Sequence, residues 1–157
     1  MLVCVVGCHN ADDARINAAR SRLLLSQEPE GAQSIADVRK RVDAQEAVTV
    51  AGEIEMAELD PFVKDRSVFW VREVTSGSHG KGAGHDASTC PFCKRKARNA
   101  PRALVQCQDE NGQEITMAAD RLLGLQKGDI VVIRGQGALD ANLDMLTITA
   151  KGIYIRP

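Results

Sequence analysis

The sequence predicts a mainly β fold of five strands, with a helical segment before it and a Cys/His metal-type insertion within it. Three observations lead to this fold class. Residues 9–46 are rich in alanine and charged residues, with apolar positions at helical spacing. From residue 48, apolar and polar residues alternate with the period of two that half-buried strands show. Residues 75–102 interrupt this alternation, so we expect one domain over 47–157 that carries an inserted loop.

Two helices are expected before the first strand. Residues 11–25 have acids early and arginines late, as the helix dipole favours. The sequence Gln-Glu-Pro-Glu-Gly at 27–31 ends this helix. Ser34 and Asp37 then have the spacing of a capping box at the start of a second helix over 35–45. These helices either pack on the β domain or form a spacer.

The β domain itself is read from its alternating runs and from the turns between them. We expect strand character over 48–54, 67–74, 103–109, 113–117, 128–135 and 144–155, and a short helix over 120–125. Asp60-Pro61 marks a turn, and Asn111-Gly112 is a strong hairpin signal. We interpret 103–109 as the second strand resuming after the insertion, which leaves five strands.

Five strands with a short helix between the third and the fourth resemble the OB-fold over 47–156. The resemblance rests on Val-Thr-Val-Ala-Gly-Glu-Ile at 48–54, Asp-Glu-Asn-Gly at 109–112, Lys-Gly-Asp-Ile-Val-Val-Ile-Arg-Gly at 127–135 and Leu-Thr-Ile-Thr-Ala at 146–150. It implies a small five-stranded barrel. The whole chain also resembles a family of small bacterial lipoproteins that carry a Cys-Pro-Phe-Cys insertion, a resemblance that implies no particular activity.

The insertion contains four residues of the types that bind zinc. His79, His85, Cys90 and Cys93 fall within fifteen residues, among glycines that leave the backbone free to wrap. Zinc takes four such ligands in structural sites, and a two-residue gap lets two cysteine sulfurs meet one ion. We therefore expect one structural zinc ion, with no open position for catalysis. A disulfide or thiol pair at Cys90 and Cys93 and an inert loop are the alternatives.

The first eight residues suggest export. The apolar run before Cys8 ends in glycine and resembles the end of a lipoprotein signal peptide, in which that cysteine is lipidated. The run is short and has no basic segment before it, which a start further upstream would explain. We expect a membrane-anchored protein of the cell envelope that faces the periplasm. A buried strand, and a cytoplasmic location if Met1 is the true start, are the alternatives.

Composition favours a binding protein over an enzyme. The net charge of -1 and pI near 6.3 give no global attraction to nucleic acid, and only 3% of residues are aromatic. No Ser-His-Asp set, paired-carboxylate signature or phosphate loop is present, and Glu53, Glu55 and Glu58 are expected to face solvent. We expect a non-enzymatic protein that binds a partner protein or a small ligand.

Two other functions compete with this expectation. A dense basic patch suits contacts with nucleic-acid phosphates, and it comprises Lys94, Arg95, Lys96, Arg98 and Arg102. Phe69 and Trp70 adjoin in one strand, so only one ring faces outward for base stacking. Separately, the segment 89–96 resembles the active site of glutaredoxin-type thiol oxidoreductases, with Cys90 as the nucleophile ahead of a helix. The sequence around this segment lacks the βαβ pattern that the glutaredoxin fold requires.

Overall fold

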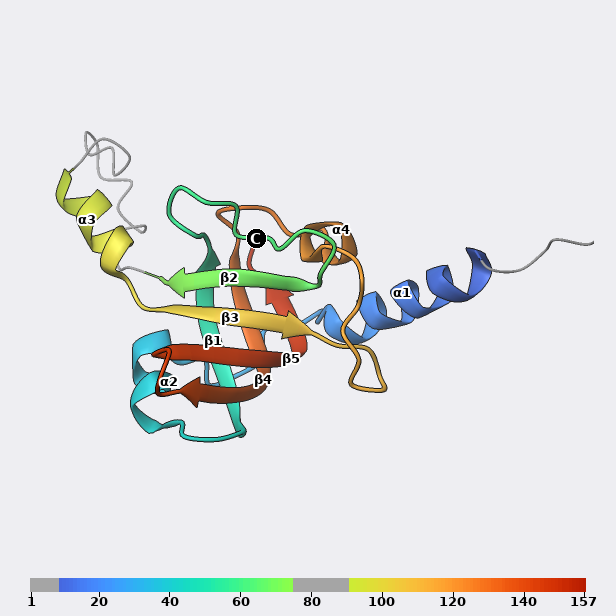
Figure 1. Cartoon of the computed structure of the whole chain (residues 1–157), viewed down its shortest axis with the longest axis horizontal. Coiled ribbons are helices and arrows are strands. Elements are labelled where there is room, and N and C mark those ends of the chain that lie inside the picture. The colour runs from blue at the N-terminus through green and yellow to red at the C-terminus, as the bar shows by residue number, and fades with distance from the viewer. Residues whose placement is uncertain (1–8, 75–90) are drawn as a thin grey trace, which may run out of the picture.

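The computed structural model describes residues 9–74 and 91–157, without the side chains of residues 9–12 and of Cys93. Its centre is a closed barrel of five strands in the order β1-β2-β3-β5-β4 (Figure 1). The strands are β1 Glu46–Ile54, β2 Val68–Glu73, β3 Arg102–Cys107, β4 Ile130–Asp140 and β5 Met145–Ile155. Neighbours pair antiparallel except β3 and β5, which run parallel. The prediction of a mainly β domain with a five-stranded barrel is confirmed.

The described part of the chain also forms helices outside the barrel. They are α1 His9–Leu23, α2 Ile35–Arg41, α3 Pro91–Asn99 and α4 Ala119–Leu123. α1 and α3 extend from opposite ends of the barrel (Figure 1). α4 connects β3 to β4, as predicted, and ends at Gly124 in the left-handed conformation.

Of the two alternatives for the segment 9–46, the structure shows packing on the barrel, by α2 and by the C-terminal end of α1. The Ser34 hydroxyl accepts from the Asp37 backbone N–H at 3.1 Å and donates to the Asp37 carboxylate at 2.9 Å, so the predicted cap of α2 is present. Ile35 and Val38 are fully buried against β1 and β2. α1 buries only Ala19 and Leu23 near its C-terminal end, and the rest of its described side chains are exposed or half-buried.

Inward-facing residues of all five strands fill the barrel. Phe69, the largest fully buried side chain, packs among aliphatic residues that alternate with outward positions along each strand. The fully buried members from the other strands include Val50, Ile54, Val105, Ile133, Leu146, Ile148 and Ile153. This core holds the outer faces of the strands in fixed positions.

The expected third strand at 113–117 is wrong, and so is the idea that the insertion splits the second strand. β2 and β3 are separate antiparallel neighbours with Arg72 opposite Arg102, and the insertion connects them. β3 pairs with β2 on one edge and β5 on the other, so neither edge is free for a further strand. Residues 113–117 make one isolated bridge, between Gln108 and Glu114, before the chain enters α4.

β4 is longer than the sequence suggested, because the expected end at Gly135 is a bend within the strand. The register shifts between Arg134 and Gly135. A Cβ atom at Gly135 would lie 2.2 Å from the Thr149 carbonyl oxygen, so only glycine allows β4 to pass this close to β5. The strand therefore continues to Asp140 and helps to close the barrel.

Candidate functional site

The side chains of the four predicted zinc ligands are not among those that the structure describes. His79, His85 and Cys90 fall outside the described residues, as does the predicted lipidation site Cys8. Cys93 is in the first turn of α3, where only its backbone is described. Among the described side chains, no group of three or more His, Cys, Asp or Glu residues is placed to hold a metal ion. The zinc site and the lipid anchor therefore stay predictions.

Cys107, by contrast, is clearly placed. It points into the barrel core, is fully buried and is a free thiol. Burial raises the pKa of this thiol to about 12, so at neutral pH it carries no thiolate. The side chain is a core residue, in line with the alternation of its strand.

α3 presents the basic patch that the sequence indicated. Lys94, Arg95, Lys96 and Arg98 are exposed on this helix, which contains no acidic residue. The ion pairs found within 9–74 and 91–157 all use other cations. α3 therefore concentrates four positive charges at one end of a chain whose net charge is -1.

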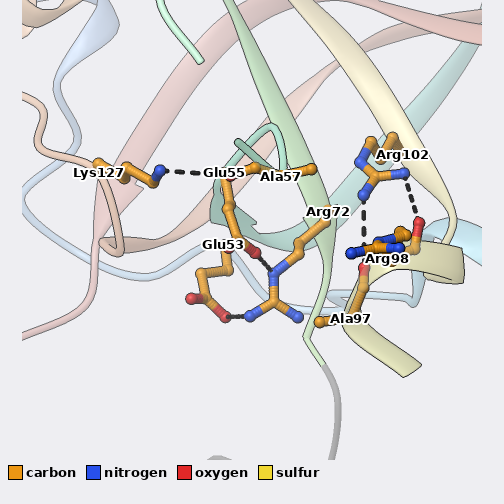
Figure 2. Close-up of polar contacts among 8 residues, drawn as sticks. All are labelled: Glu53, Glu55, Ala57, Arg72, Ala97, Arg98, Arg102 and Lys127. Atoms are coloured by element: carbon orange, nitrogen blue, oxygen red, sulfur yellow. Dashed lines mark hydrogen bonds and ion pairs between the residues drawn. The ribbon is translucent and has the colours of Figure 1, made fainter. Parts of the chain in front are cut away.

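Arg102 was predicted as part of the same basic patch, but its side chain has a structural role. Its side chain turns back toward α3, where Nη1 donates to the Arg98 carbonyl at 3.1 Å and Nη2 is 3.4 Å from the Ala97 carbonyl (Figure 2). The last carbonyls of a helix have no partner within the helix, so Arg102 satisfies two of them. This side chain thus anchors α3 to the start of β3.

A charge cluster beside Arg102 was not recognised in the sequence. The Arg72 Nη2 atom lies 2.7 Å from the Glu53 carboxylate, and its Nε atom contacts Glu55 (Figure 2). Arg72 is only 9% exposed, and the two glutamates are partly buried instead of facing solvent as expected. Glu58 is exposed, as expected. The two carboxylates offset the repulsion between Arg72 and the cross-strand Arg102.

The sequence did contain a signal for this cluster. Glu53 is in β1 and Glu55 follows its last residue, so the spacing of two places both on one side of the chain, and Glu53 lies opposite Arg72 on β2. Recognising the contact requires the register of the two strands, which the alternation alone does not give.

The outer face of β2, β3 and β5 carries a half-exposed row next to these charges. Trp70 lies opposite Leu104, which in turn lies opposite Thr147, and all three are partly exposed. Phe69 points inward and Trp70 outward, which confirms the expected orientation of the two rings. Trp70 precedes Arg72 by two residues on the same face of β2, so the indole lies near the basic end of the barrel.

The described site is therefore suited to binding. It offers one outward indole and an aliphatic neighbour on the barrel wall, and a group of exposed cations on the adjoining helix α3. Such a surface can attract an anionic partner and hold a flat apolar group beside it. No helix in the described ranges is long and apolar enough to cross a lipid bilayer.

Comparison with known proteins adds no assignment. No protein family and no curated protein matches the sequence. The resemblance to lipoproteins with a Cys-Pro-Phe-Cys insertion therefore stays a prediction.

Proposed function

We propose that this protein is a non-enzymatic binding module that holds an anionic partner at the outer face of β2, β3 and β5. The observation that carries the proposal is the position of α3. This helix, which carries four exposed basic residues, lies at the end of the strands β2 and β3 that also present Trp70 and Leu104 (Figure 1). Cations attract the partner over distance, and the indole supplies contact area once it has arrived.

The strand order supports the assignment of the barrel to the OB-fold. The parallel pair of β3 and β5 closes the barrel, and α4 lies between β3 and β4. OB-folds bind extended ligands on the face of their second and third strands. Trp70 and Leu104 occupy this face in the present barrel.

The proposal keeps the envelope location and the zinc ion that the sequence suggests. A lipid on Cys8 would tether the protein to a membrane surface without spanning it. A zinc ion on His79, His85, Cys90 and Cys93 would stabilise the glycine-rich insertion that leads into α3. In this arrangement the metal supports the binding surface, and the partner is an acidic protein or a small acidic ligand of the envelope.

Single-stranded nucleic acid is the second candidate partner. The observation in its favour is the outward indole beside a basic helix, because bases stack on aromatic rings while phosphates contact Lys and Arg. Trp70 and Phe92, which is 81% exposed on α3, give a short stacking platform. We therefore expect a weak and strongly salt-dependent interaction if this candidate is right.

The chain offers a direct test, since Trp70 is its single tryptophan. We expect its fluorescence to change when a polyglutamate peptide is added at low salt, and a single-stranded oligothymidylate of ten nucleotides tests the second candidate. Binding should weaken in Lys94→Gln with Lys96→Gln and persist in the control Lys64→Gln with Lys151→Gln, which neutralises two exposed lysines elsewhere. If neither probe binds, or if both double variants lose binding equally, the proposal is wrong.

The zinc ion has its own test. Protein purified without chelator should contain about one zinc per chain, and Cys90→Ser with Cys93→Ser should contain none. A metal-free protein that reduces insulin disulfides, and loses this activity in Cys90→Ser, would instead support the thiol oxidoreductase.

A further inference from the structure

An open hollow of about 480 Å³ lies between α2, the junction of α3 with β3, and the turn that joins β4 to β5. Its lining residues are Ala36, Arg39, Lys40, Asn99, Ala100, Pro101, Arg102 and Asp144. Small side chains and a proline keep it open, and charged groups from three parts of the chain surround it. Its size is within the range of small-molecule sites in proteins.

Positive charge dominates this hollow. Arg39 and Lys40 come from α2 and Arg102 from β3, whereas Asp144 supplies the single lining carboxylate. Lys40 is 3.1 Å from Asp37 in a pair that is largely exposed on both sides, and such pairs are weak. The Lys40 ammonium can therefore turn toward an anion in the hollow at little cost.

In this structure Asp144 accepts hydrogen bonds from the guanidinium of Arg39. The Arg39 Nη2 atom donates to both the carbonyl and the carboxylate of Asp144, while no described residue accepts from its other two nitrogens. The Asp144 side chain is 83% exposed, but that of Arg39 is only 22% exposed. Water competes strongly for such an exposed carboxylate, so an incoming anion can displace it from the better-sheltered cation.

Asp144 also has an unusual backbone. Its φ angle is +49°, in the left-handed region that most side chains avoid. The turn before it is fixed by the Asp140 carboxylate, which accepts from the N–H groups of Asn142 and Leu143. This turn places a carboxylate at the rim of a basic hollow, where it acts as an internal counter-ion.

We propose that this hollow binds a phosphate group, and that the phosphate replaces the Asp144 carboxylate on Arg39. A guanidinium donates two parallel hydrogen bonds to a phosphate, and the Lys40 ammonium adds a point charge from the same helix. The hollow is larger than a phosphate ion and leaves room for an organic group, so the ligand that we propose is a phosphate monoester. The site uses α2 and not Trp70, and it is independent of the function proposed above.

To test this proposal, the protein is titrated with three probes that each carry a phosphate group. These are inorganic phosphate, adenosine monophosphate and vesicles of phosphatidylcholine with phosphatidic acid, each followed by calorimetry or sedimentation. Binding of the nucleotide above inorganic phosphate would establish a monoester site, and binding of vesicles alone would identify a lipid headgroup as the source. If none of the three binds at millimolar phosphate, the proposal is wrong.

Two variants move the affinity in opposite directions. Arg39→Gln with Lys40→Gln should weaken binding about tenfold or more, because two cations are lost. Asp144→Asn should strengthen it about threefold or more, because the competing carboxylate is gone and asparagine tolerates a positive φ. Arg41→Gln is the matched control, since Arg41 is on the same helix but binds Glu46 and Gln33 outside the hollow.

These outcomes remain decisive even if the double variant unfolds. Asp144→Asn keeps both cations and the turn, so unchanged or weaker phosphate binding in this folded variant would overturn the proposed displacement. A loss of affinity in Arg41→Gln equal to that in the double variant would show that only the overall charge of α2 matters, and it would also overturn the site.

Discussion

The two ends of the barrel use basic side chains in opposite ways. At the α1 end they hold the helix against α4 and the segment after β3: Arg20 Nε donates to the Leu122 carbonyl at 2.6 Å, Arg22 donates to the Gln108 carbonyl, and Arg15 pairs with Asp109 at 2.5 Å. At the α3 end the basic side chains of the helix are exposed. The contact with the barrel comes from Arg102 of β3, which donates a hydrogen bond to the Arg98 carbonyl. Arginines at the first end fix a helix, whereas the cations on α3 pair with no carboxylate among residues 9–74 and 91–157.

The difference shows why counting charges along the sequence says little about function. α1 contains three arginines, but hydrogen bonds to carbonyls of α4 and of the segment after β3, and to Asp109, engage all three. α3 has a similar number of cations and no such engagement among the described residues. The position of the cation relative to unpaired carbonyls and carboxylates decides which role it has.

The largest effect is expected at Arg72, the structural cation beneath the α3 end. Arg72→Met leaves two partly buried glutamates without a counter-charge, and we expect a loss of about 2–3 kcal/mol in the free energy of unfolding. Urea denaturation followed by circular dichroism measures this loss. Because Glu53 and Glu55 remain 18% and 25% exposed, the expected loss is below that of a fully buried pair.

A rescue experiment separates charge from packing at this site. Combining Arg72→Met with Glu53→Gln and Glu55→Gln removes the unpaired carboxylates and should restore at least half of the lost stability. If the triple variant is no more stable than Arg72→Met, the contribution of Arg72 comes from packing of its side chain and not from the two ion pairs.

A smaller effect is expected at the α1 end. Arg20→Ala removes the donor to the Leu122 carbonyl and should cost about 1–2 kcal/mol, as a hydrogen bond from a charged group does. Hydrogen exchange of α1 amides should speed up at the same time, because α1 has few other anchors. Arg121→Ala is the control, since that side chain is exposed and only its carbonyl takes part. Equal effects of the two variants would contradict the proposed anchoring.

Local patterns in the sequence predicted the elements well but not their partners. Alternation located the strands, and the spacing of Ser34 and Asp37 located the start of α2, since both signals lie within a few neighbouring residues. The strand expected at 113–117 follows a strong turn signal, but β5 pairs with the edge of β3 that this strand would have needed. Strand pairing joins residues far apart in the chain, and no local pattern encodes it.

The candidate sites show the same limit. The exposure of the α3 cations follows from composition, because long charged side chains on a short helix outside the barrel remain in water. The Arg72 cluster joins residues 19 positions apart, and the hollow brings α2 together with the turn between β4 and β5, 105 residues later. These contacts depend on closure of the barrel, so the sequence alone could not reveal them.

Acid should weaken the α1 end, where Asp109 pairs with Arg15. Backbone N–H groups of the 109–113 turn, led by that of Gln113, and the Arg15 guanidinium hold the pKa of Asp109 below its ordinary value of 3.8. A lowered pKa in the folded state gives stability that is present above the ordinary value and is lost as the pH falls below it. Asp109→Asn should therefore make the free energy of unfolding less dependent on pH below about 4. Thermal melts from pH 6 to pH 2.5 measure this, and an unchanged slope would contradict it.

The smallest expected effect on stability is that of the exposed lysines on α3. Lys94→Gln with Lys96→Gln should change the free energy of unfolding by no more than about 0.5 kcal/mol, because neither side chain contacts a described carboxylate. The same double variant should weaken the binding of polyanions, since it removes half of the positive charge of α3. A substantial loss of stability would mean that these lysines hold the insertion in place, and the contrast between the two ends of the barrel would disappear. Denaturation and binding measured on the same preparation distinguish these results.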